Sequence, residues 1–97
     1  MKTFYSDYVN HCLRFYSRHS DPEFRSEADK SNWNACKEAL EEFNDKDREI
    51  LTTIFREGDT IPDNVYQMAK KLNTKQDGIW RLVSDLERKV AKKRGLI

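Results

Sequence analysis

Apolar residues recur at intervals of three and four along almost the whole of this 97-residue chain, and this spacing limits the possible folds more than any other feature. One face of an α-helix collects positions i, i+3, i+4 and i+7, whereas a half-buried strand alternates apolar and polar residues. No such alternating stretch occurs, and only three glycines and two prolines interrupt the helical pattern. The spacing therefore predicts an all-α domain of five helices.

Residues 1–43 are expected to form the first two helices. The first helix is predicted from Thr3 to His19. The second begins at Pro22 or at Ser31 and ends near Phe43, because proline fits the first turn of a helix but not its interior. The first helix is unusually aromatic, so its surplus apolar surface is a candidate homodimer interface. The expected apolar face of the first helix comprises Phe4, Tyr5, Tyr8, Val9, Cys12, Leu13, Phe15 and Tyr16, with the aromatic residues covering the body of the domain. The second helix has Trp33, Cys36, Leu40 and Phe43 in near-heptad spacing.

Residues 44–97 are expected to form three further helices. Asn44, three residues before Asp47, suits an N-cap, and Gly58 is predicted to end the third helix. A polar link follows, and the fourth helix is expected to close at Asn73 in a left-handed conformation. Thr74 with Asp77 resembles a capping box for the fifth helix. The predicted inner stripes are Ile50, Leu51, Ile54 and Phe55; Val65, Met68, Ala69 and Leu72; and Ile79, Leu82, Val83, Leu86 and Val90.

Charge is divided unevenly along the chain. The stretch from Lys70 to Ile97 carries nine Lys and Arg against three Asp and Glu, a net charge of +6. The preceding residues carry nine basic and fourteen acidic side chains, a net of −5, although the whole chain has a charge of only +1. Because the basic end also has helical spacing, the charge division indicates binding to a polyanion, most simply duplex DNA.

Several function classes lack their motifs. The sequence contains no glycine-rich phosphate loop, no Gly-x-Ser-x-Gly turn and no His-Glu-x-x-His, and so small a helical domain offers little volume for a substrate. We expect no enzyme activity and no cofactor. His11 and His19 lie more than two helical turns apart, so no metal site is expected. Cys12 and Cys36 are expected to be buried reduced thiols in a cytoplasmic protein, because neither a signal peptide nor a membrane span is recognisable.

A short helix, a tight turn and a longer basic helix describe a helix-turn-helix. From Ala39 to Leu86, the segments ALEEFNDKDREILTTIFREG and VYQMAKKLNTKQDGIWRLVSDL resemble region four of bacterial sigma factors and the small phage or mobile-element regulators similar to it. The matching positions are a small residue, a large apolar residue, a turn residue and an aliphatic anchor: Ala69, Leu72, Asn73 and Ile79. Three features depart from the family: a longer link between Gly58 and Val65, asparagine in place of a common glycine at 73, and Gly78.

The resemblance implies that the helix at about residues 75–93 enters the major groove. Gln pairs with adenine, Arg with guanine, and Asp accepts a hydrogen bond from cytosine, whereas lysines near the turn would contact phosphates without reading sequence. The expected base-reading residues are Gln76, Asp77, Trp80, Arg81 and Ser84. The expected phosphate contacts are Lys70, Lys71, Thr74, Lys75, Arg88 and Lys89.

Other interpretations stay open at several of these positions. Trp80 could pack against a neighbouring helix, Asp77 could serve only as a capping residue, and Gly78 could either allow close approach to DNA or precede the true start of the helix. The chain is too short for a whole sigma factor, although RNA polymerase is a candidate partner through Glu38, Glu41 and Glu42. We thus predict a sequence-specific DNA-binding regulator of transcription; the alternative is a protein-interaction module of the same shape that does not bind DNA.

Overall fold

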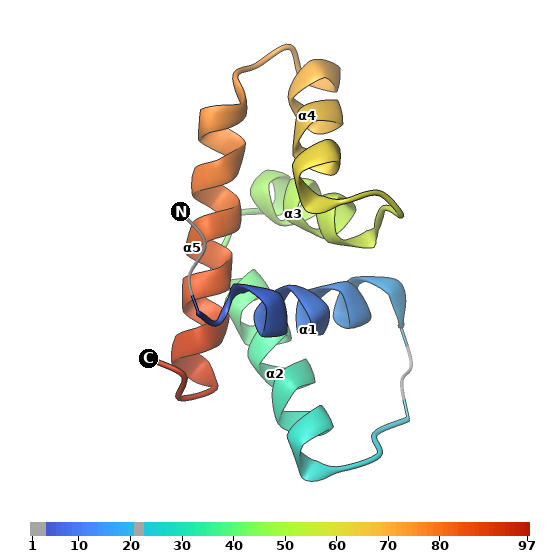
Figure 1. Ribbon diagram of the computed structural model, residues 1–97, viewed down its shortest axis with the longest axis vertical. Coiled ribbons are helices and arrows are strands. Elements are labelled where there is room, and N and C mark those ends of the chain that lie inside the picture. The colour runs from blue at the N-terminus through green and yellow to red at the C-terminus, as the bar shows by residue number, and fades with distance from the viewer. Residues whose placement is uncertain (1–3, 21–22) are drawn as a thin grey trace.

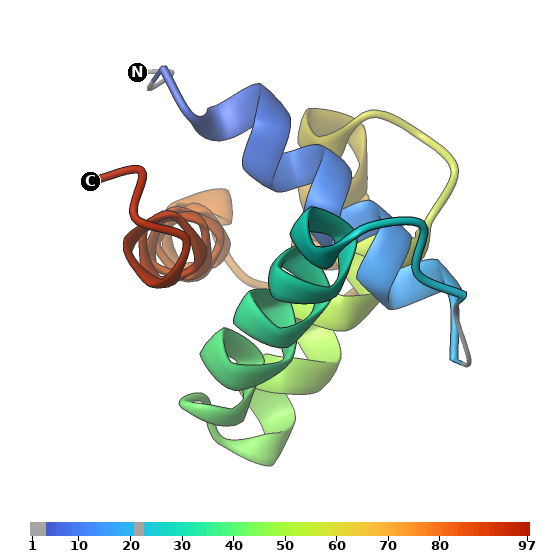
Figure 2. The ribbon, with the colours of Figure 1, turned by 90° about the horizontal axis from the view of Figure 1, so that it is seen from below.

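The computed structural model describes residues 4–20 and 23–97, in which five helices and no strand occur. The all-α prediction with five helices is confirmed. The longest helix, α5 (Gln76–Lys93), runs along the 41 Å axis of the molecule and contacts each of the other four (Figures 1 and 2). The helices are α1 (Ser6–Arg18), α2 (Glu27–Glu41), α3 (Asp45–Arg56), α4 (Ile61–Lys71) and α5 (Gln76–Lys93).

Side-chain caps set the start of three helices. Ser26, Asn44 and Thr60 each accept a hydrogen bond from the backbone N–H three residues on, at 3.2, 2.8 and 3.2 Å. The Asn44 cap was predicted. The start of α2 was not, since Ser31 lies inside the helix and Pro22 falls outside the described residues.

The connection between α3 and α4 is shorter than the sequence suggested. Helix α3 ends at Arg56, before Gly58, and Thr60 with Pro62 begins α4 where a polar link was expected. Only residues 57–60 therefore join the two helices, and the long link inferred between Gly58 and Val65 was wrong.

The turn between α4 and α5 is closed by backbone hydrogen bonds around a left-handed residue. Asn73 has φ 53°, as predicted, and its N–H donates to the Lys70 carbonyl at 3.2 Å. The next N–H, of Thr74, donates to the Ala69 carbonyl at 2.9 Å. These two bonds satisfy carbonyls that would otherwise be unpaired at the end of α4.

Two predictions at this turn were wrong. Thr74 does not cap α5, because the helix begins one residue later than expected; the N-cap is Lys75, which makes no side-chain capping bond. Leu72 does not point inward. It is the C-cap of α4, and it is 41% exposed because the chain turns away from the core at that residue.

We expect Asn73→Val to lower the free energy of unfolding by about 1–2 kcal/mol, because a β-branched side chain is strained in the left-handed region. Asn73→Gly removes that strain and should be neutral or slightly stabilising. Urea denaturation followed by circular dichroism measures both. Equal stability of the two variants would contradict the turn geometry.

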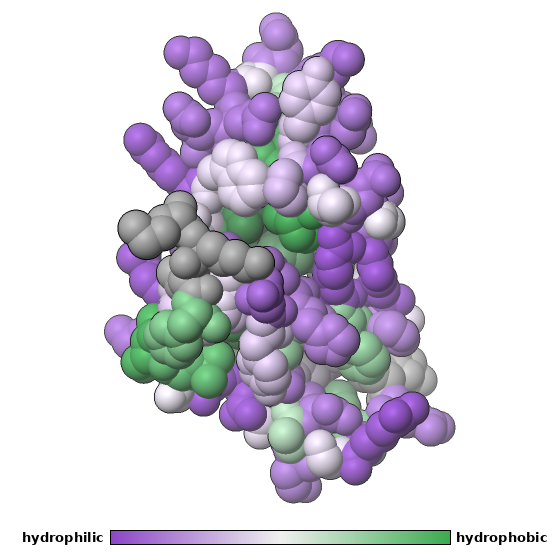
Figure 3. All heavy atoms as spheres, viewed as in Figure 1, coloured by the Kyte–Doolittle hydropathy of each residue, from purple (hydrophilic) through white to green (hydrophobic). Residues whose placement is uncertain are grey.

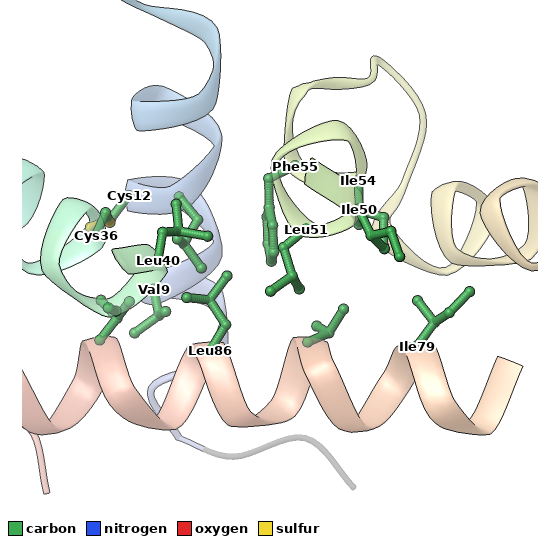
Figure 4. Packing of buried hydrophobic residues seen from close by; sticks show 14 of the residues in the cluster. Val9, Cys12, Cys36, Leu40, Ile50, Leu51, Ile54, Phe55, Ile79 and Leu86 are labelled. Atoms are coloured by element: carbon green, nitrogen blue, oxygen red, sulfur yellow. The ribbon is translucent and has the colours of Figure 1, made fainter. Parts of the chain in front are cut away.

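The core follows the predicted inner stripes of α3, α4 and α5, with two exceptions: Leu72 and the partly buried Leu82. In Figure 4, Ile79 and Leu86 point from α5 toward side chains of the other helices. Helix α1 buries only part of its expected apolar face. It buries Val9, Cys12 and Leu13. The aromatic prediction fails for Tyr8 and Phe15, which lie on the edges of the buried face and are 45% and 38% exposed. Tyr5 and Tyr16 pack partly buried against the core.

Both cysteines are free and buried, as expected. Burial raises the pKa of the Cys36 thiol to about 12, which makes it unreactive at neutral pH. Among the described helices, none is both long and apolar enough to cross a membrane.

Candidate nucleic-acid interface

The end of α4, the following turn and the first half of α5 form one hollowed surface. A hollow of about 580 Å³ lies between α4 and the start of α5, and a second of about 410 Å³ continues along α5. We call this surface the α4–α5 face. It is lined by Tyr66, Ala69, Lys70, Thr74, Lys75, Gln76, Asp77, Trp80, Arg81, Ser84 and Asp85.

All five expected base-reading residues line this face. Gln76, Asp77, Arg81 and Ser84 are exposed along α5, on the side away from Ile79, Val83 and Leu86. The turns of α5 bring them together, because its buried stripe fixes the helix against the core and leaves the opposite side free. In Figure 3, hydrophilic side chains crowd the end of the molecule where α4 and α5 meet.

Trp80 is partly buried and packs against the core, which supports the packing interpretation of this residue. Its side chain nevertheless lines both hollows of the α4–α5 face. Trp80 therefore forms part of this surface while it is packed against the core.

Three of the expected phosphate contacts also line the face: Lys70, Thr74 and Lys75. The Lys70 ammonium lies 5.8 Å from the centre of the Tyr66 ring, within reach of a cation–π contact. Lys71 is exposed in the last turn of α4, beside Lys70 in sequence. The result is a cluster of ammonium groups next to the exposed start of α5.

The two remaining expected phosphate contacts, Lys89 and Arg88, already have partners within the protein. Lys89 Nζ lies 3.1 Å from Glu42 Oε1 and 5.9 Å from the centre of the Phe43 ring, and Lys93 Nζ lies 2.8 Å from Glu42 Oε2. These hydrogen bonds lower the pKa of the Glu42 carboxyl. Arg88 pairs with Asp85 at 3.0 Å but remains largely exposed. The basic end therefore has two parts, and Lys89 and Lys93 serve to join α5 to the end of α2.

Gly78 is the third residue of α5, so the interpretation that the helix begins after it is wrong. A Cβ atom added there would meet no heavy atom within 4 Å. Internal packing therefore does not require glycine at 78, and the residue is exposed.

Sequence reasoning missed a group of residues that positions α4. Asn64 is buried, and its Nδ2 donates to the Ile54 carbonyl at 2.8 Å and to the Asp59 carbonyl at 3.1 Å. From α1, Arg14 and Arg18 donate to the Glu57 carbonyl at 2.9 and 2.8 Å. Together they pair backbone groups in the link between α3 and α4. The only signal of this group in the sequence was a polar residue, Asn64, next to Val65 of the apolar stripe.

No family model, curated protein or solved structure matches the chain. Within the described ranges, no three His, Cys, Asp or Glu side chains are grouped so that they could hold a metal ion.

Proposed function

We propose that the protein binds duplex DNA sequence-specifically through the α4–α5 face and regulates transcription. In this proposal α4, its turn and α5 act as a helix-turn-helix similar to that of sigma region four. One observation carries it: four of the five predicted base readers, Gln76, Asp77, Arg81 and Ser84, share one exposed side of α5, next to Lys70 and Lys75. The opposite side of α5 is occupied by the core.

The proposed base contacts and phosphate contacts follow from the chemistry of the side chains. Helix α5 lies in the major groove, where Arg81 can donate two hydrogen bonds to guanine and Gln76 can pair with adenine. Asp77 is acceptor-only when ionised, so it favours cytosine and disfavours phosphate. Helix α4 braces the complex across the backbone, with Lys70, Lys71 and Lys75 on phosphates. The exposed Gly78 lets the backbone approach the base edges.

Lys75→Ala should weaken binding to all duplexes alike and make the log–log salt dependence shallower by about 1, because one phosphate contact is lost. Lys89→Ala is the matched control. It removes the same charge, but this ammonium is bound to Glu42, so its effect on DNA binding should be smaller. Fluorescence anisotropy with one labelled duplex over a salt series compares the two. A larger effect of Lys89→Ala would place the DNA elsewhere.

We also infer that a second copy of the chain is the partner of the N-terminal helices, because Tyr8, Phe15 and Phe24 are 45%, 38% and 40% exposed. Two copies would suit a palindromic DNA site. Sedimentation velocity should show a dimer that Phe15→Ser dissociates, and a wild-type monomer at all concentrations would contradict it. Of the three acidic candidates, Glu42 pairs with Lys89 and Lys93, so Glu38 and Glu41, exposed on α2, are the proposed contacts with RNA polymerase.

A further inference from the structure

A third hollow, of about 550 Å³, lies where the start of α1, the start of α4 and the middle of α5 meet. It adjoins the α4–α5 face, with which it shares Trp80 and Ser84. Its other walls come from the start of α1, the first turn of α4 and Glu87 of α5, residues that the proposed DNA contacts do not use. It is lined by Ser6, Asp7, Asn10, Ile61, Pro62, Trp80, Ser84 and Glu87.

The polar side of this hollow is rich in hydrogen-bond acceptors. Glu87 is partly buried, which raises the pKa of its carboxyl, and a hydrogen bond with Ser6 partly offsets that effect. Asn10 Oδ1 is buried and finds no hydrogen-bond donor among the described residues. Glu87 supplies a carboxylate to this lining, and none of its described residues is Lys, Arg or His. A ligand with N–H donors and a positive charge would complement these groups.

The remaining walls are apolar. Ile61 and Pro62 come from the first turn of α4, and Trp80 presents its indole from α5. An indole attracts organic cations through its ring, and aliphatic walls favour a hydrocarbon body. Hydrogen-bond acceptors on one side of the hollow and apolar groups on the other would complement a ligand with an ammonium head and a short apolar chain.

We propose that this hollow is a binding site for a small organic ammonium ion. The ammonium group lies toward Glu87 and Asn10, and the apolar body lies against Trp80, Ile61 and Pro62. The site is independent of the proposed DNA binding. Only its consequence rests on that function: an occupant in contact with Trp80 and Ser84 would change how the α4–α5 face meets DNA.

The test uses the full chain without DNA, so it gives an answer whether or not the protein binds DNA. Hexylammonium chloride is titrated while two-dimensional ¹H–¹⁵N NMR follows the two indole N–H signals. The Trp80 signal should shift and saturate, with a Kd in roughly the millimolar range for so small a ligand. Trp33, which does not line this hollow, serves as the internal reference. The neutral analogue 1-hexanol should bind at least about tenfold more weakly.

Two variants sharpen the result. Glu87→Gln removes the charge at constant size and should weaken hexylammonium binding about tenfold, whereas Glu49→Gln on the exposed side of α3 should not. If Glu87→Gln fails to fold, Ser84→Leu changes an exposed position and should abolish the shift by filling the hollow. Equal binding of hexylammonium and 1-hexanol, equal shifts of both indoles, or unaltered binding by Ser84→Leu would overturn the proposal.

Discussion

Phe55→Ala should lower the free energy of unfolding by about 3–5 kcal/mol. Phe55 is fully buried on α3, the helix that contacts α1, α4 and α5 at once. Figure 4 shows it beside Leu51 and facing α5. Truncation removes apolar contacts and leaves a cavity that three helices would have to move to fill. Chemical denaturation monitored by circular dichroism gives the loss directly.

The matched control is another phenylalanine of the same chain. Phe4 is 82% exposed, so Phe4→Ala should change the unfolding free energy by no more than about 0.5 kcal/mol. Phe55→Leu fills most of the site and should cost less than Phe55→Ala. Similar losses for Phe55→Ala and Phe4→Ala would contradict the described core.

Arg81→Ala should weaken binding to the preferred duplex by about 1–3 kcal/mol, roughly 5- to 150-fold, and relax the preference at one base pair. Arg81 is exposed in the middle of the α4–α5 face, between Asp77 and Ser84 on the lining of the same hollow. Its guanidinium can make two hydrogen bonds to guanine, which a phosphate contact would not require. Selection from a random duplex pool, followed by anisotropy titrations, measures preference and affinity.

Arg81→Lys separates charge from base recognition. It keeps the positive charge but loses the paired donors, so it should lose sequence preference while it retains binding to unrelated duplexes. If Arg81→Ala selects the same sites as the wild type with the same affinity, α5 does not read DNA as proposed.

The parts of the fold that depend on local signals were predictable. Helical spacing fixed the stripes that contain Leu51 and Leu86, and Asn44 and Asn73 acted as cap and turn residue as their chemistry suggests. The start of α2 was less predictable, because the sequence suggested Pro22 or Ser31, whereas the structure caps the helix with Ser26. The predicted Thr74 cap was wrong, because the turn that closes α4 extends to Thr74 and α5 begins only after it.

Contacts between residues far apart in sequence were not predictable. Nothing local indicates that Lys89 pairs with Glu42, 47 residues away, or that Arg14 reaches the Glu57 carbonyl. The exposed side of α5 follows from its spacing, so the five base-reading candidates could be grouped in advance. The hollow beside Glu87 could not, since it depends on how α1 and α4 cross α5.

The central claim is that the α4–α5 face binds DNA through phosphate contacts and base edges. The most direct measurement is a titration of the protein against a fluorescent random-sequence duplex at about 50 mM and about 200 mM salt. We predict a log–log slope of about −3 to −6, so that the binding constant falls by about 60- to 4,000-fold between the two conditions. Absence of binding at the lower salt concentration would contradict the claim and favour the alternative of a protein-interaction module.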